Sequence, residues 1–190
     1  MKKVLGNILP ALLTFLPYIC IAVFYVLGAL SGTLNEKVGA YLMVATVIFY
    51  VVVVGANIIY VIIWMCIGVE SQKILFWDMF MKLSYIPIFC ITFIGIIGGL
   101  LTLIVGGVGI IGIMLILDVI LFIPTSIYGL CGCIQAAREK NANIALAIVM
   151  GFMHFILCLD VVAAIVMYVT VRGSNKKRRD ALNMAYGNYY

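Results

Sequence analysis

Long apolar runs, separated by short polar or glycine-rich stretches, dominate the pattern of hydrophobic and polar positions along the chain. An apolar helix of about 20 residues can cross the roughly 30 Å hydrocarbon core of a bilayer, and it satisfies its own backbone hydrogen bonds there. Five runs are long enough, and they cover residues 4–30, 40–68, 83–105, 110–136 and 143–171. The pattern therefore predicts an all-α fold: a polytopic transmembrane helical bundle with five membrane-spanning helices.

The segment between the second and third runs, residues 70–82, has a different pattern. Its large apolar side chains would share one side of a helix, and Trp77 suits the level of the lipid headgroups. Asp78 and Lys82 are spaced for a pair one helical turn apart. We expect an interfacial amphipathic helix here, lying between the second and third spans.

The composition supports a membrane location. Of the 190 residues, 66% are hydrophobic and only 10% are charged, and the mean hydropathy is +1.27. A chain of this kind has too little polar surface to cover a water-soluble globule. We expect a multi-pass protein of the cell membrane, with residues 1–172 forming a single transmembrane helical domain and residues 173–190 a basic, disordered C-terminal tail.

Positively charged residues usually mark the cytoplasmic side of a membrane protein, but five crossings divide the twelve Lys and Arg residues equally. One side would receive Lys2, Lys3, Lys73, Lys82, Arg138 and Lys140, and the other Lys37, Arg172, Lys176, Lys177, Arg178 and Arg179. The densest cluster, at residues 172–179, favours a cytoplasmic C-terminus and an external N-terminus. Four crossings, with one apolar segment re-entrant or interfacial, would instead place both basic ends on one side, and this alternative stays open.

A face of small residues on the third run indicates close helix packing. Lipid is as apolar as leucine, so helices in a bilayer associate where small side chains let their backbones approach. Gly95 and Gly99 have the GxxxG spacing, and Thr92 and Thr102 fall on the same side. We expect this face to contact another helix, either in the same chain or in a second copy that forms a homo-oligomer.

Two aspartates lie deep inside apolar runs, Asp118 in the fourth and Asp160 in the fifth. Because a charge at the bilayer centre costs several kcal/mol, we expect both side chains to face the bundle and to meet there. His154 would lie about 120° from Asp160 on a continuous helix, so these two are not expected to pair. Lys82 is the nearest cation in sequence and could extend towards an aspartate.

Two roles are open for these groups: contacts that fix the register of the helices, or a path for protons or ions. The membrane-buried polar candidates are Asp118, Asp160, Asn57, His154, Thr125, Ser126 and Lys82.

Known catalytic patterns are missing from the sequence. No GxGD precedes either aspartate, the single histidine excludes HExxH zinc chemistry, and GxSxG and Walker A do not occur. We therefore predict no catalytic, cofactor-binding or metal-binding residue. The expected partners are the lipid bilayer, with anionic headgroups at the basic tail, and a membrane partner protein, but no nucleic acid.

Three stretches carry a resemblance: "LFWDMFMKLSYIPIF" (75–89), "LDVILFIPTSIYG" (117–129) and "FILCLDVVAAIVMYV" (155–169). Over about residues 73–169 the chain resembles a family of small, uncharacterised polytopic membrane proteins of Gram-positive bacteria. The resemblance implies a bacterial cell membrane, and the positions that match its motif are Lys82, Asp118, Ser126, Tyr128 and Asp160. The chain departs from the motif at Tyr85, where the family pattern has a histidine, and this weakens the case for a titratable role at that site.

These observations favour a non-enzymatic integral membrane protein, an accessory, immunity or partner-binding component. The alternative is a small transporter or an ion- or proton-conducting subunit that uses Asp118 and Asp160. A dry, packed interface around the carboxylates would favour the first function, and a water-accessible cavity near the midplane would favour the second.

Overall fold

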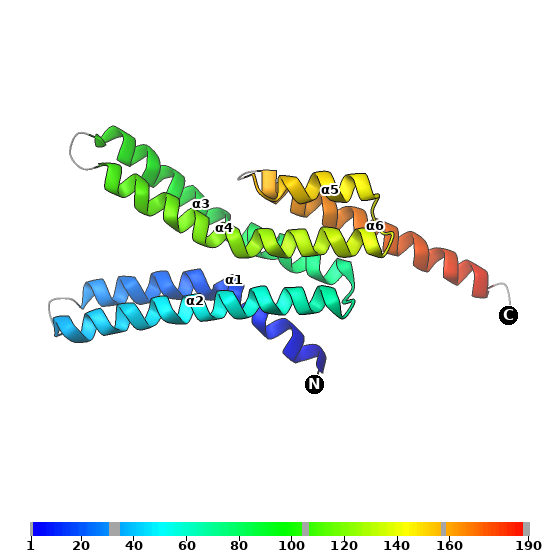
Figure 1. The fold of residues 1–190 in the computed structure, drawn as a ribbon, viewed down its shortest axis with the longest axis horizontal. Helices are drawn as coiled ribbons and strands as arrows, with labels where there is room; N and C mark the ends of the chain where they lie inside the picture. The colour runs from blue at the N-terminus through cyan, green and yellow to red at the C-terminus, as the bar shows by residue number, and fades with distance from the viewer. Residues whose placement is uncertain (1, 31–34, 104–106, 157–158, 188–190) are drawn as a thin grey trace. The chain divides into compact units, whose positions relative to one another are not determined.

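Every regular element in the computed structural model is an α-helix, and the structure describes residues 2–30, 35–103, 107–156 and 159–187. The helices, drawn in Figure 1, are α1 (Lys2–Ala29), α2 (Glu36–Cys66), α3 (Ser71–Leu101), α4 (Gly107–Arg138), α5 (Ile144–Met153) and α6 (Leu159–Gly187). Helices α1 to α4 are each long and apolar enough to cross a membrane. The all-α prediction and the presence of apolar, membrane-length helices are confirmed.

The predicted fifth span is not continuous. Among the described residues four helices, not five, have the length and composition to span a bilayer. Helix α5 has 10 residues, which extend only about 15 Å, half of the hydrocarbon core. The chain then turns at residues 154–156, and α6 begins at Leu159. The apolar run over residues 143–171 is therefore a short helix, a break and a second helix.

The segment expected to form a separate interfacial helix is the beginning of α3, which is continuous from Ser71 to Leu101. Ile74, Leu75 and Met81 have no exposed surface. One side of this segment thus belongs to the core.

The expected disordered tail is helical as far as the structure describes it. Helix α6 continues to Gly187, and the described side chains from Lys176 onwards are exposed. Residues 188–190 lie outside the described part of the chain.

The chain forms two compact units, Met1–Tyr60 and Val61–Tyr190, where a single domain was expected. In the first unit α1 packs on α2 through a small cluster that includes Leu16 and Val53. Asn57 is buried there, and its amide donates a hydrogen bond of 3.0 Å to the carbonyl of Val53 on its own helix.

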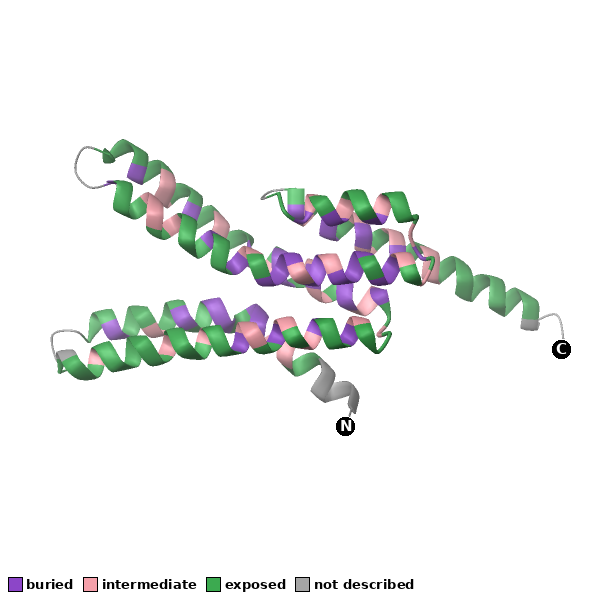
Figure 2. Cartoon of the chain, viewed as in Figure 1, coloured by how far each residue is buried: buried purple, intermediate pink, exposed green. Residues whose placement is uncertain are grey.

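In the second unit α3 and α4 form an antiparallel pair, and α5 and α6 form a hairpin against one half of that pair (Figure 1). We call this the covered half; it comprises residues 71–88 of α3 and 121–138 of α4 together with the hairpin that packs on them. The remainder, residues 92–101 of α3 and 107–118 of α4, is called the two-helix half. Burial is concentrated in the covered half (Figure 2). Its apolar core consists of Leu75, Cys133, Ala136, Ala147, Met167 and Val171.

Residues with left-handed backbone conformation follow α2 and α4, namely Gly68 with φ 74° and Lys140 with φ 56°. In both turns the next amide bonds to the carbonyl five residues earlier, at 2.9 Å after Gly68 and 3.0 Å after Lys140. This Schellman arrangement satisfies carbonyls at the end of a helix and reverses the chain. The two reversals bring Ser71, at the start of α3, beside Glu139.

Candidate functional site

Four ionisable side chains meet inside the covered half, and we call them the intramembrane cluster. Asp78 and Lys82 come from α3, His154 follows α5, and Asp160 lies in the first turn of α6. Their exposed fractions are 0%, 1%, 0% and 4%. Lys82 Nζ lies 2.7 Å from Asp78 Oδ1 and 2.5 Å from Asp160 Oδ1. The contact with Asp78 is an ion pair whose angles do not meet those of a hydrogen bond. His154 Nδ1 is 2.7 Å from both Lys82 Nζ and Asp160 Oδ1.

The depth of the cluster follows from the helical rise. Lys82 is eleven residues after Ser71, which corresponds to about 16 Å along the axis of α3. The start of α3 is polar, with Glu70 and Lys73 in this region and Glu139 in contact with it. Half of the hydrocarbon core is about 15 Å, so an α3 that begins at the membrane surface carries the cluster close to the midplane.

The charges of the cluster nearly balance. Two ionised carboxylates and one ammonium leave one negative charge, so the cluster is neutral when it holds one further proton, either on His154 or on a carboxyl group. His154 Nδ1 can accept a hydrogen bond from Lys82 or donate one to Asp160, but it cannot do both. A proton on Nδ1 therefore allows the bond to Asp160 and excludes the bond from Lys82, and an unprotonated Nδ1 does the reverse.

The break between α5 and α6 creates this geometry. The amides of Phe155 and Ile156 bond to carbonyls three residues back, at 3.0 and 3.1 Å, which winds the chain more tightly than an α-helix. This turn brings His154 and Asp160 into contact although they are six residues apart. The prediction that they would not pair is wrong, because it assumed a continuous helix.

Helix α4 holds the break from the other side. Ser126 Oγ donates a hydrogen bond of 2.7 Å to the backbone carbonyl of His154. Gly129 faces the imidazole so closely that an added Cβ would lie 2.6 Å from ring atoms. Within the described part of the chain His154 Nε2 has no hydrogen-bond partner, and it lies 3.8 Å from Asp78 Oδ2.

Asp118 is not a member of the cluster. It lies in the two-helix half, where Thr92 Oγ1 donates a hydrogen bond of 2.7 Å to Asp118 Oδ1. The expected meeting of Asp118 with Asp160 is therefore wrong, since each carboxylate has partners of its own. Thr125 bonds to its own helix, at 2.9 Å from the carbonyl of Phe122.

Gly95 and Gly99 face α4 in the two-helix half. An added Cβ at Gly99 would lie 2.7 Å from Ile111 Cγ1, and one at Gly95 would lie 3.1 Å from Met114. The helix that packs on the GxxxG face thus belongs to the same chain. The hydroxyl of Thr102 bonds to its own helix, at 2.9 Å from the carbonyl of Gly98, whereas its backbone carbonyl accepts a hydrogen bond of 3.0 Å from the amide of Gly107, the first residue of α4.

A second polar group, absent from the sequence-based candidates, is centred on Glu139. Its carboxylate accepts hydrogen bonds from the Ser71 amide at 2.9 Å, from the Ser71 hydroxyl, from Gln135 at 3.0 Å and from Asn141 at 2.9 Å. A carboxylate at the amino end of α3 interacts favourably with the helix dipole. The polar stretch at residues 138–143 indicates a loop in the sequence but does not reveal these partners.

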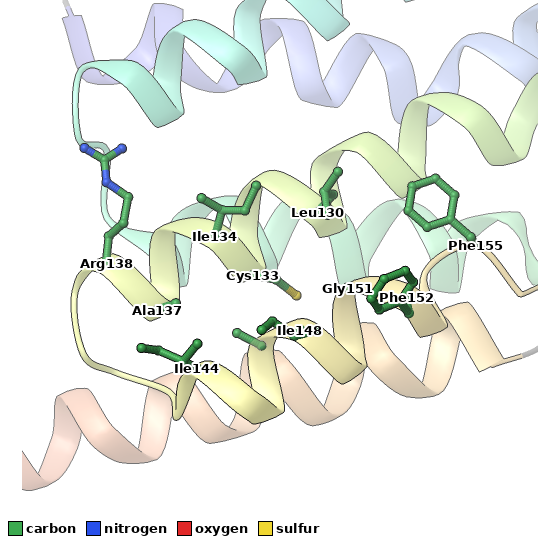
Figure 3. Close-up of a pocket in the computed structure, with 11 residues that line it drawn as sticks. Leu130, Cys133, Ile134, Ala137, Arg138, Ile144, Ile148, Gly151, Phe152 and Phe155 are labelled. Atoms are coloured by element: carbon green, nitrogen blue, oxygen red, sulfur yellow. The ribbon is translucent and has the colours of Figure 1, made fainter.

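Neither of two large hollows in the second unit is lined by the intramembrane cluster. The first, of about 550 Å³, lies between α4 and α5 and is bordered by apolar side chains such as Leu130, Ile148 and Phe152 (Figure 3). At its end Arg138 extends away from the hollow, and its guanidinium donates to the carbonyl of Met65 at 3.2 Å. The four side chains of the cluster are buried by protein. Their charges are therefore compensated by one another and not by solvent.

The fold and this site define an α-helical protein with membrane-length helices and a buried ionisable cluster. No family model, curated protein or solved structure matches the chain. Among the described residues no group of three or more His, Cys, Asp or Glu side chains is arranged to hold a metal ion. The ammonium of Lys82 lies where a cation would have to approach the carboxylates of Asp78 and Asp160.

Proposed function

We propose that the protein is a non-enzymatic integral membrane protein, an accessory, immunity or partner-binding component of a bacterial cell membrane. In this proposal the intramembrane cluster clamps the hairpin of α5 and α6 against α3. The observation that carries the proposal is the burial of the cluster, in which no member is more than 4% exposed. Such a cluster favours a fixed arrangement, because removing one partner of a buried ion pair costs about 3–5 kcal/mol.

The short α5 supports a topology of four crossings and a re-entrant hairpin. Both outer ends of the hairpin lie near the start of α3. On α6, Asn175 Nδ2 donates a hydrogen bond of 2.9 Å to Gln72 Oε1. The neighbouring Ser174 Oγ donates one of 3.5 Å to Oδ1 of Asn141, which precedes α5. In this topology ten of the twelve Lys and Arg residues fall on one side, Lys37 and Lys82 being the exceptions. The positive-inside rule then places the N- and C-termini in the cytoplasm.

Cysteine labelling tests this topology in a cysteine-free background. We expect a cysteine after Tyr190 and one at Lys3 both to resist a membrane-impermeant thiol reagent in intact cells. A cysteine at Lys37 is the control and should react. Labelling of only one of the two termini would support five crossings and contradict the proposal.

A second candidate, proton movement through the cluster, is favoured by one specific observation. His154 Nδ1 is 2.7 Å from both Lys82 Nζ and Asp160 Oδ1 and can bond to only one of them at a time. Its Nε2 lies 3.8 Å from Asp78 Oδ2. A protonated His154 would thus point one N–H at each carboxylate. Chains of Asp and His residues relay protons in membrane transporters.

Proton flux into liposomes separates the two candidates. The purified full-length chain is reconstituted with an internal pH-sensitive dye, and a potassium diffusion potential is applied. The clamp predicts the flux of protein-free liposomes, for the wild type and for Asp160→Asn alike. A wild-type flux that Asp160→Asn abolishes, with unchanged thermal stability, would replace the clamp with the second candidate.

A further inference from the structure

A second hollow of about 550 Å³ lies where the beginning of α3 faces the outer part of α6. Three cationic side chains line it, Lys73 from α3 and Arg178 and Arg179 from α6, against one carboxylate, that of Glu70. The positive charge exceeds the negative charge, so the hollow attracts an anion. Arginine forks match the oxygens of a phosphate group and bind them through two parallel hydrogen bonds.

The same hollow has an apolar side. Phe76, Tyr168 and Leu182 line it together with the cations. The rings of Phe76 and Tyr168 lie 6.0 Å apart, joining α3 to α6, and Phe76 also contacts Trp77 at 5.8 Å. A small soluble anion would leave this apolar surface unused, whereas a molecule with a charged head and a hydrocarbon body would cover both sides.

The hollow also lies at the depth that such a molecule occupies. Measured from Asp160 along α6, Tyr168 is about 12 Å and Arg178 about 27 Å further out at 1.5 Å per residue. The hydrocarbon core ends about 15 Å from the midplane, and the headgroups extend a further 5–7 Å or so. The aromatic side chains thus reach the edge of the core, and the arginines, with their long side chains, reach the headgroup layer.

Contacts on both helices fix the shape of this hollow. Asn175 donates a hydrogen bond of 2.9 Å to Gln72 Oε1 across α6 and α3. The ammonium of Lys73 lies 4.3 Å from the centre of the Trp64 ring, a cation–π contact that positions it. Lys176 and Lys177, on the same stretch of α6, do not line the hollow.

We propose that this hollow is a binding site for an anionic phospholipid of the phosphatidylglycerol type. Arg178, Arg179 and Lys73 bind the phosphate, and Phe76, Tyr168 and Leu182 contact the glycerol and upper acyl region. The site does not depend on the role of the intramembrane cluster.

The test compares two double variants that remove the same charge. Phosphatidylglycerol is titrated onto the full-length protein in a non-ionic detergent, and lipid-bound species are counted by native mass spectrometry. We expect Arg178→Gln with Arg179→Gln to weaken binding about thirtyfold, at about 1 kcal/mol per cation. Lys176→Gln with Lys177→Gln should bind as the wild type does.

Three outcomes would overturn the proposal. Equal weakening in both double variants would show diffuse attraction to the basic helix instead of a site. Phosphatidylcholine binding as tightly as phosphatidylglycerol would show that the anion is not recognised. Glycerol 3-phosphate binding as tightly as the lipid would assign the hollow to a free phosphate compound. Circular dichroism of all variants shows whether α6 is retained, which separates loss of the site from loss of the helix.

Discussion

The two halves of the α3–α4 pair lie in the same polypeptide but are held together by different interactions. In the two-helix half, Gly95 and Gly99 let the backbones approach, and one hydrogen bond joins Thr92 to Asp118. In the covered half, ionisable side chains from α3, from the residue after α5 and from α6 form one buried cluster. The first half consists of two helices, whereas in the second a hairpin supplies half of the buried ionisable groups.

This difference shows how a buried polar group determines structure. A threonine–aspartate pair satisfies one acceptor and adds little constraint on the surrounding chain. The cluster contains two carboxylates and one ammonium, and none of these can be left alone in a low-dielectric interior. In the proposed clamp the position of the hairpin is set by Lys82, which contacts carboxylates from two separate elements.

Removing the charge of Lys82 should produce the largest effect. Lys82→Met leaves Asp78 and Asp160 buried together without an opposite charge, and we expect a loss of about 3–5 kcal/mol in stability. Thermal unfolding in detergent measures it. Lys37→Met, an exposed position, is the matched control and should unfold at the wild-type temperature. Equal stability of the two variants would mean that the cluster does not hold the covered half.

Crowding the two-helix half should have an intermediate effect. Gly99→Leu places a side chain where a Cβ alone would lie 2.7 Å from Ile111, and we expect a loss of about 1–3 kcal/mol. Gly98→Leu is the control, because no atom lies within 4 Å of its added Cβ. Equal unfolding temperatures for the two leucine variants would place the contact between α3 and α4 elsewhere.

The smallest effect is expected for the side-chain hydrogen bond between Thr92 and Asp118 in the two-helix half. Thr92→Val keeps the shape of the side chain and removes the donor to Asp118, which we expect to cost about 0.6 kcal/mol. Thr102→Val removes a hydroxyl that bonds only within its own helix, so it serves as the reference in the same unfolding assay. If Thr92→Val lost as much stability as Lys82→Met, the hydrogen bond would stabilise its half as strongly as the cluster stabilises the other, and the comparison would fail.

Apolar length predicts the membrane-length helices well, because a bilayer allows few other structures for a long hydrophobic run. The spacing of Gly95 and Gly99 also indicates a packing face, because side-chain size is visible in the sequence. The break after Met153 could not be predicted in this way. Gly151 lies inside α5, and no proline or glycine occurs at residues 152–156 where the helix ends, so the local sequence does not mark the position of the break. The break is stabilised by contacts from Lys82 and Ser126, which are distant in sequence.

Three of the four members of the candidate site were predictable from the sequence, but their arrangement was not. Lys82, His154 and Asp160 stand out as ionisable groups in apolar surroundings. Their pairing depends on the turn between α5 and α6, and a continuous helix would place His154 and Asp160 on different sides. The sequence pattern placed Asp78 in an interfacial helix. Its side chain is buried in the structure, because the hairpin of α5 and α6, which the sequence does not reveal, packs over it.

A double-mutant cycle between Lys82 and Asp160 tests the central claim most directly. The free energy of unfolding is measured in detergent for Lys82→Met, Asp160→Leu and the double variant. Since the two side chains are 2.5 Å apart, the clamp predicts that the double variant loses about 1–3 kcal/mol less stability than the sum of the single losses. Losses that add to within about 0.5 kcal/mol would show that the two residues do not interact and would contradict the clamp.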